Sequence, residues 1–171
     1  MPNLRGLWVW GAIAALMLTA LAFAGDKKNK NKYQNIEVVR FDIKEGVNFP
    51  VDYLHTMTEE LVSQLQQTGK FGQVLREGET PEKADVPTIR LVGTVTEFQP
   101  GSVAKRVLVG FGSGKTKVVA HVKFLDKATG EVLFEDDVDG KVWRGAVGGE
   151  SIGATRGLAK EVAKVGKQQF F

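Results

Sequence analysis

The clearest structural signal in the chain is residues 116–125, TKVVAHVKFL, in which apolar and polar side chains alternate. Successive side chains of a strand point to opposite faces, so four apolar residues from Val118 to Phe124 share one face. Residues 126–130, DKATG, then have the composition of a hairpin turn that ends in a positive-φ glycine. Residues 131–142 therefore predict the partner strand of this hairpin.

Two amphipathic helices are predicted on either side of further strands. Apolar residues recur at helical spacing from Val51, and Gly69 supplies a left-handed cap, which predicts a helix over residues 51–68. A second helix is predicted over residues 151–168. Its apolar stripe consists of Ile152, Thr155, Ala159, Val162 and Val165, flanked by Leu158.

The remaining predicted strands are residues 36–43, 71–76 and 88–98. The resulting order is β-α-β-β-β-β-α. This order predicts an α+β fold, a two-layer sandwich of two helices on a mostly antiparallel, curved sheet.

The N-terminus predicts export from the cytoplasm. Residues 7–21, LWVWGAIAALMLTAL, form an apolar run that is too short for a comfortable span of a ~30 Å hydrocarbon core. Ala22 and Ala24 then fit the small-residue site of a signal peptidase. We expect a signal peptide over residues 1–24, cleavage before Gly25, and a periplasmic or secreted protein. An uncleaved anchor is the alternative.

Residues 25–34 are predicted to be a lysine- and asparagine-rich flexible linker before a single domain over residues 35–171. The lysines of this linker are Lys27, Lys28, Lys30 and Lys32. They favour either a solvated segment or a weak contact with an anionic membrane surface. The net charge of the chain is only +3, so it gives no reason to expect a nucleic-acid partner.

Composition removes several kinds of chemistry. The chain has no cysteine, which excludes disulfides, thiol catalysis, cysteine-ligated zinc and a lipid-modified cysteine. His55 and His121 are too few to form a metal site unaided. We therefore expect no catalytic residue, no cofactor and no metal. The alternative is a hydrolase-like enzyme with a scattered polar site of His121, Glu97 and Asp136.

Residues 110–116, GFGSGKT, end like a phosphate-binding loop. Such a loop needs glycine five positions before Gly114, where this chain has Val109, and it must lead into a helix. Here a strand follows, so we expect no nucleotide partner.

Two glycine-rich loops, residues 101–114 and 145–153, are predicted to join the same sheet. Binding surfaces use aromatic and arginine anchors among adaptable loop residues, so Phe111, Trp143 and Arg144 are candidates for one interaction surface. The alternative is that Phe111 and Trp143 are core residues.

The C-terminal half resembles a known family. The residues that carry the resemblance are KRVLVGFGSG at 105–114, the strand over 118–125, Thr129-Gly130-Glu131, and Gly148-Gly149 before an alanine-rich helix with Arg156. They resemble the bacterial envelope family catalogued as domain of unknown function 4410, over roughly residues 35–170.

The resemblance implies an exported or lipid-anchored protein with no assigned reaction, and a shape similar to periplasmic curli-secretion-channel and TolB-type domains. It implies no catalytic residue, and the missing lipobox cysteine departs from the lipoprotein members. We expect a non-enzymatic module that binds another envelope protein. A peripheral membrane-surface protein held by the lysine tail is a further alternative to the hydrolase.

Overall fold

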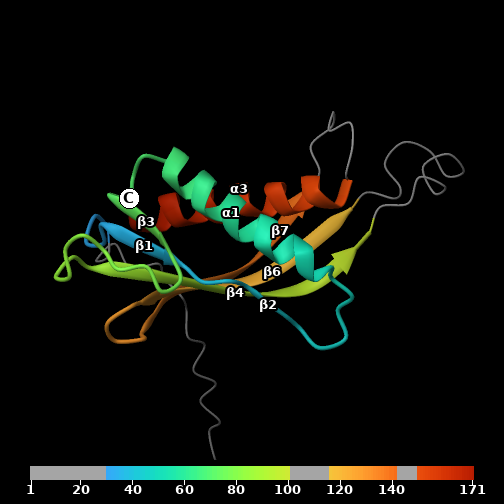
Figure 1. The fold of residues 1–171 in the computed structure, drawn as a ribbon, viewed down its shortest axis with the longest axis horizontal. Helices are drawn as coiled ribbons and strands as arrows, with labels where there is room; N and C mark the ends of the chain where they lie inside the picture. The colour runs from blue at the N-terminus through green and yellow to red at the C-terminus, as the bar shows by residue number, and fades with distance from the viewer. Residues whose placement is uncertain (1–29, 101–115, 142–149) are drawn as a thin grey trace, which may run out of the picture.

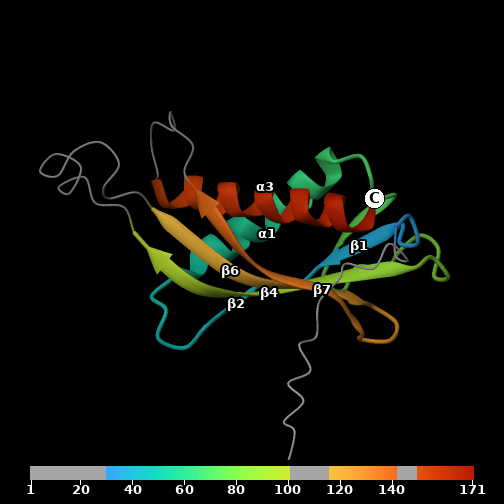
Figure 2. The same cartoon turned by 180° about the vertical axis from the view of Figure 1, so that it is seen from behind.

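The computed structural model describes residues 30–100, 116–141 and 150–171. The helices are α1 (Val51–Gln67) and α3 (Glu150–Phe170). The strands are β1 (Asn35–Val38), β2 (Asp42–Ile43), β3 (Gln73–Arg76), β4 (Thr88–Gln99), β6 (Lys117–Asp126) and β7 (Val132–Lys141). Both helices pack on the same face of one sheet, with α3 over β6 and β7 (Figures 1 and 2). The predicted two-layer α+β sandwich is confirmed.

The hairpin of β6 and β7 forms as the alternation predicts. The four apolar side chains expected to share a face of β6 are fully buried. In the turn, Asp126 Oδ1 accepts the backbone N–H groups of Ala128 and Thr129 at 2.9 and 3.2 Å. Gly130 adopts a φ of 75°, which glycine tolerates because it has no Cβ. Local sequence alone therefore specifies this turn.

Helix α1 also matches its prediction, and Gly69 follows it with a φ of 61°. Its buried residues are Leu54, Met57, Leu61, Val62 and Leu65. Neither helix of the described ranges is long and apolar enough to cross a membrane.

Helix α3 buries most of the predicted stripe, and the stripe is wider than predicted. Its fully or nearly buried residues include Ala154, Thr155, Leu158, Ala159, Val162, Ala163 and Phe170. Ile152 and Val165 are only half-buried. The helix packs closely against Gly140 on β7, where an added Cβ would overlap the Ala154 carbonyl oxygen and lie 2.7 Å from Leu158 Cβ. The helix thus sits directly on the backbone of β7.

The sheet is mixed, so the prediction of a mostly antiparallel sheet is wrong. The strand order is β3-β1-β4-β6-β7, with β2 paired to β4. Strand β1 runs parallel to β3 and β4, and β2 runs parallel to β4, whereas β4–β6 and β6–β7 are antiparallel. Helix α1 lies between β2 and β3 and provides the crossover that makes β1 and β3 parallel. Residues 77–87 then return the chain without a helix, so that β4 is also parallel to β1.

The predicted strand over residues 36–43 is interrupted. Strand β1 ends at Val38 and β2 begins at Asp42, and between them Phe41 is 1% exposed. A Cβ added to Gly93 of β4 would lie 2.5 Å from the Phe41 ring. Gly93 therefore provides the space in which the ring joins the core.

The folded unit begins before residue 35. Tyr33 is 1% exposed, and its hydroxyl donates to Asp126 Oδ2 at 2.8 Å. The Asn31 N–H donates to the Phe170 carbonyl at 2.7 Å. The predicted linker over residues 25–34 is therefore too long at its C-terminal end, because Tyr33 is a core residue.

Candidate functional site

Three neighbouring strands stop together at one end of the sheet. The register pairs Gln99, the last residue of β4, with Lys117, and pairs Lys117 with Lys141 at the end of β7. The segments 101–115 and 142–149 begin and end at or next to this edge, and both lie outside the described residues.

Several residues predicted to be functional fall outside the described ranges. They are Phe111, Trp143 and Arg144 of the candidate interaction surface, Ala22, Ala24 and Gly25 of the cleavage site, and Lys27 and Lys28 of the tail. Of the other tail lysines, Lys32 lies 3.7 Å from Asp126 and donates to the Tyr33 hydroxyl at 3.1 Å.

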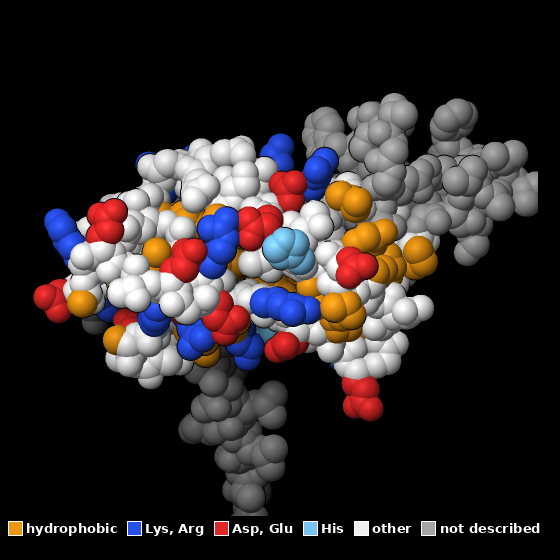
Figure 3. All heavy atoms as spheres, viewed as in Figure 1, with side chains coloured by type: hydrophobic (Ala, Val, Ile, Leu, Met, Phe, Trp, Pro, Cys, Tyr) orange, Lys and Arg blue, Asp and Glu red, His pale blue; other side chains and the backbone are white. Residues whose placement is uncertain are grey.

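An apolar surface lies where α1 begins and β4 ends. Val51 has 60% of its surface exposed, which is unusual for a large aliphatic side chain in this fold. Ile43, Val47, Tyr53 and Phe98 are half-buried. We call these five residues the strand-end surface. Figure 3 shows hydrophobic side chains gathered at this end of the molecule.

The strand-end surface rests on one buried aromatic ring. Phe49 is 4% exposed, and its ring centroid lies 5.9 Å from that of Tyr53 and 5.1 Å from that of Phe98. Both contacts are edge-to-face, a favourable geometry for aromatic pairs. The surface is therefore held on a packed base rather than on a loose loop.

The three residues of the hydrolase alternative do not come together. His121 and Glu97 lie on the face of the sheet without helices, and Glu97 is held by Lys117 at 2.7 Å, which lowers the pKa of its carboxyl. Asp136 is opposite the buried Val122, so alternation places it on the helix-bearing face. This separates it from His121.

His121 lies instead between two other carboxylates of β7. Its Nδ1 is 2.9 Å from Asp137 Oδ1 and its Nε2 is 3.6 Å from Glu135 Oε2. Lys123 contacts Glu135 at 3.0 Å and lowers the pKa of that carboxyl. In the described ranges, no group of three or more His, Asp or Glu side chains is arranged to hold a metal ion. The arrangement is a cross-strand ladder of polar and charged side chains.

Sequence reasoning did not identify a buried carboxylate on β1. Glu37 is 3% exposed, although strand alternation turns it away from the helices. Lys127 Nζ contacts its Oε1 at 3.0 Å, the Gly78 N–H donates to the same oxygen at 3.4 Å, and Arg90 Nε lies 3.3 Å from Oε2. Two cations and a backbone amide thus offset the loss of hydration.

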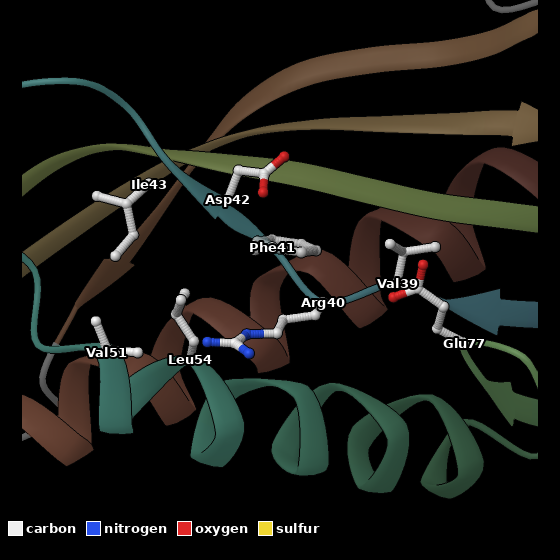
Figure 4. A pocket seen from close by; sticks show the side chains of 8 residues that line it. All are labelled: Val39, Arg40, Phe41, Asp42, Ile43, Val51, Leu54 and Glu77. Atoms are coloured by element: carbon white, nitrogen blue, oxygen red, sulfur yellow. The ribbon is translucent and has the colours of Figure 1, made fainter.

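A hollow of about 510 Å³ opens between the β1–β2 segment and α1 (Figure 4). We call it the edge hollow. Its lining residues are Val39, Arg40, Phe41, Asp42, Ile43, Val51, Leu54 and Glu77. The Arg40 guanidinium extends toward Leu54, whereas the Asp42 carboxylate points away from α1 (Figure 4). No local pattern in the sequence predicts this hollow, because its lining residues come from three segments that are separate along the chain.

Comparison with known proteins places the chain in a family. Residues 47–146 match the family described as Domain of unknown function (DUF4410), which confirms the predicted resemblance. Among curated proteins, no sequence matches the chain.

Similar solved structures share the fold at low identity. A PelC dodecamer from Paraburkholderia phytofirmans has a TM-score of 0.52 and 16% identity, over 77% of this chain and 86% of that chain. A variant of PelC in another crystal form gives 0.53 and 15%, over 78% and 86%. A Xanthomonas campestris protein described as DUF330 gives 0.51 and 11%, over 80% and 85%. At these identities the likeness concerns the fold alone.

Proposed function

We propose that this chain, which belongs to the DUF4410 family, is an exported accessory module that binds another protein of the cell envelope. The export part rests on the apolar run over residues 7–21 and the Ala22-Phe23-Ala24 site. The binding part rests on the strand-end surface and on the composition of the two glycine-rich segments that follow β4 and β7 along the chain.

One observation carries the binding proposal. Gln99, Lys117 and Lys141 are neighbours across three strands, so the segments 101–115 and 142–149 both join the sheet at this end. The exposed Val51 belongs to the strand-end surface, which lies at the end of β4. In the proposal, Phe111, Trp143 and Arg144 act together with Val51 as anchors for one partner. Arginine and tryptophan are over-represented among the residues that dominate binding energy, which supports this choice.

Capture of a partner tests the proposal. The exported protein, tagged and mildly crosslinked in envelope extracts, should capture a defined protein that mass spectrometry identifies. Phe111→Ala, Arg144→Ala and Val51→Asp should each abolish that capture while lowering stability by less than about 1 kcal/mol, as is usual for exposed sites. Val132→Asp is the matched control, because Val132 is 40% exposed but starts β7 at the hairpin.

Two results would contradict the proposal. Capture that persists in all three variants would show that Val51, Phe111 and Arg144 do not bind the partner. A loss of about 3–5 kcal/mol in Phe111→Ala or Trp143→Ala would identify that residue as core.

Export has its own test. Intact-mass measurement of the exported protein should give Gly25 as the first residue. Replacing Ala24 by leucine should block cleavage, because the peptidase site accepts only small residues there. Retention of Met1 in the membrane fraction by the unaltered chain would overturn the export proposal.

A further inference from the structure

The edge hollow lies in an unfilled strand position of the sheet. Strand β3 runs beside β1 and ends at Arg76, whereas β2 continues alongside β4 and pairs with β4 alone. In the described ranges no strand lies on the other side of β2. A sheet edge of this kind presents backbone donors and acceptors that another chain can pair with.

The backbone of Ile43 points into this position. Lys44 N–H donates to the Val95 carbonyl at 2.9 Å, so Lys44 directs its amide toward β4. Backbone groups of adjacent strand residues point to opposite sides, which turns the N–H and C=O of Ile43 away from β4. Arg40 and Phe41 make no backbone–backbone hydrogen bond within the described residues.

The side chains around the hollow set the chemistry of an occupant. Leu54 and the exposed Val51 form an apolar wall on α1. Arg40 is exposed and forms no ion pair with any described residue, while Glu77 is already engaged by Arg90 at 3.6 Å. Asp42 also lines the hollow, but its carboxylate points away from α1, so Arg40 is the charged group directed toward the apolar wall (Figure 4). A guanidinium binds a carboxylate through two parallel hydrogen bonds.

We propose that the edge hollow binds an extended peptide of a partner protein, which adds as a strand beside β2. Its backbone pairs with Ile43, an acidic side chain reaches Arg40, and an apolar side chain two positions away contacts Val51 and Leu54. Strand addition takes its affinity from main-chain hydrogen bonds and its specificity from alternate side chains. The hollow of about 510 Å³ is within the usual range of ligand sites, roughly 300–1,000 Å³.

The probe is the capped peptide acetyl-Thr-Val-Thr-Glu-Thr-Val-Ser-amide, titrated into isotopically labelled protein and followed by NMR. Backbone amides of residues 39–43 should shift. A peptide with lysine in place of glutamate should bind about tenfold more weakly or worse, because it opposes Arg40. In Arg40→Glu this preference should reverse. Lys160→Glu, the same charge change on the exposed face of α3, should behave as the unaltered protein.

Backbone pairing is tested separately with N-methylated peptides. Two peptides are compared, one methylated at the odd-numbered amides and the other at the even-numbered amides. Only one of these two sets of amides faces β2, so methylation should abolish binding of one peptide and leave that of the other unchanged. Equal binding of both peptides overturns strand addition. If the backbone amides of residues 39–43 do not shift, the edge hollow is not the binding site. The same conclusion follows if the glutamate peptide binds Arg40→Glu and Lys160→Glu with equal affinity. Val51 and Ile43 belong to both the strand-end surface and the edge hollow, but the peptide assay varies only the peptide and Arg40. The proposed function is tested through Phe111 and Arg144, which take no part in the peptide assay, so the two failures are distinguishable.

Discussion

Glu37 shows how one residue can couple distant parts of this chain. It lies on β1, while Lys127 belongs to the β6–β7 turn and Arg90 to β4. Glu37→Gln should lower the free energy of unfolding by about 1–3 kcal/mol, because both cations would lose a buried counter-charge. The loss stays below that of a fully buried pair since Lys127 and Arg90 are 34% and 41% exposed.

Urea unfolding at neutral pH measures this loss. The matched control is Glu59→Gln, whose carboxylate contacts Arg76 at 2.7 Å but is 42% exposed. An exposed pair of this kind contributes about 0–1 kcal/mol. Equal losses in the two variants would contradict a special role for burial at Glu37.

Asp126 predicts a pH dependence. The Tyr33 hydroxyl and the amides of Ala128 and Thr129 donate to its carboxylate and hold its pKa below the ordinary value of 3.8. Because the folded pKa is the lower one, the stabilisation is fully present above the unfolded pKa and is lost as the pH falls through the folded value. Asp126→Asn should therefore cost about 1–2 kcal/mol at neutral pH and progressively less below about pH 4.

Urea unfolding at a series of pH values compares Asp126→Asn with the unaltered protein. Tyr33→Phe removes the largest cause of the lowered pKa while keeping the ring, so its acid transition should begin at a higher pH. A stability difference between Asp126→Asn and the unaltered protein that stays constant down to about pH 2 would rule out this linkage.

Among the elements, α3 and β7 make the closest contact that glycine permits. Gly140→Ala should lower the free energy of unfolding by about 1–3 kcal/mol, because the new methyl group meets the backbone of α3, which cannot move aside like a flexible side chain. Gly72→Ala is the control, since its Cβ would lie 3.5 Å from the nearest atom, an ordinary contact. Chemical denaturation of both variants measures the difference, and a cost at Gly72 as large as that at Gly140 would argue against close packing as the cause.

Elements whose structure depends on nearby residues were predictable from sequence. The buried stripe of α1 follows helical spacing, and the Asp126–Gly130 turn is specified by hydrogen bonds within five residues. The parallel pairing of β1 was not predictable, because its partners β3 and β4 are chosen by the path of the chain around α1. The close approach of α3 to Gly140 was not predictable either, because Gly140 lies on another element.

The candidate sites show the same division. Alternation places Glu37 on the face of the sheet without helices, and its burial depends on Lys127, Gly78 and Arg90, which are distant in sequence. Arg40 carried no local signal, because its hollow exists only where β3 stops short of β2. Phe111, Trp143 and Arg144 remain predictions, since they lie outside the described residues.

At the scale of the whole molecule, the first described residues join the last turn of the chain. Tyr33 packs edge-on against Phe170 with ring centroids 6.0 Å apart, and Asn31 donates to the Phe170 carbonyl. The two helices cover one face of the sheet (Figure 2), and these contacts fasten residues 31–33 to the C-terminal end of α3. The N-terminal boundary of the domain should therefore be sharp.

Truncation tests that boundary. A chain that begins at Lys30 should unfold with the same free energy as one that begins at Gly25, within about 0.5 kcal/mol, because it keeps every described contact of Asn31 and Tyr33. A chain that begins at Asn35 should lose about 3–5 kcal/mol, the usual cost of removing a large buried ring. Tyr33→Phe in the longer chain separates the two contributions of this residue. It keeps the ring against Phe170 and loses only the hydrogen bond to Asp126, so it should cost about 1–2 kcal/mol. Thermal and urea unfolding measure the stability of the four proteins. Equal stability of the chains that begin at Lys30 and Asn35 would show that residues 30–34 belong to the linker and not to the domain.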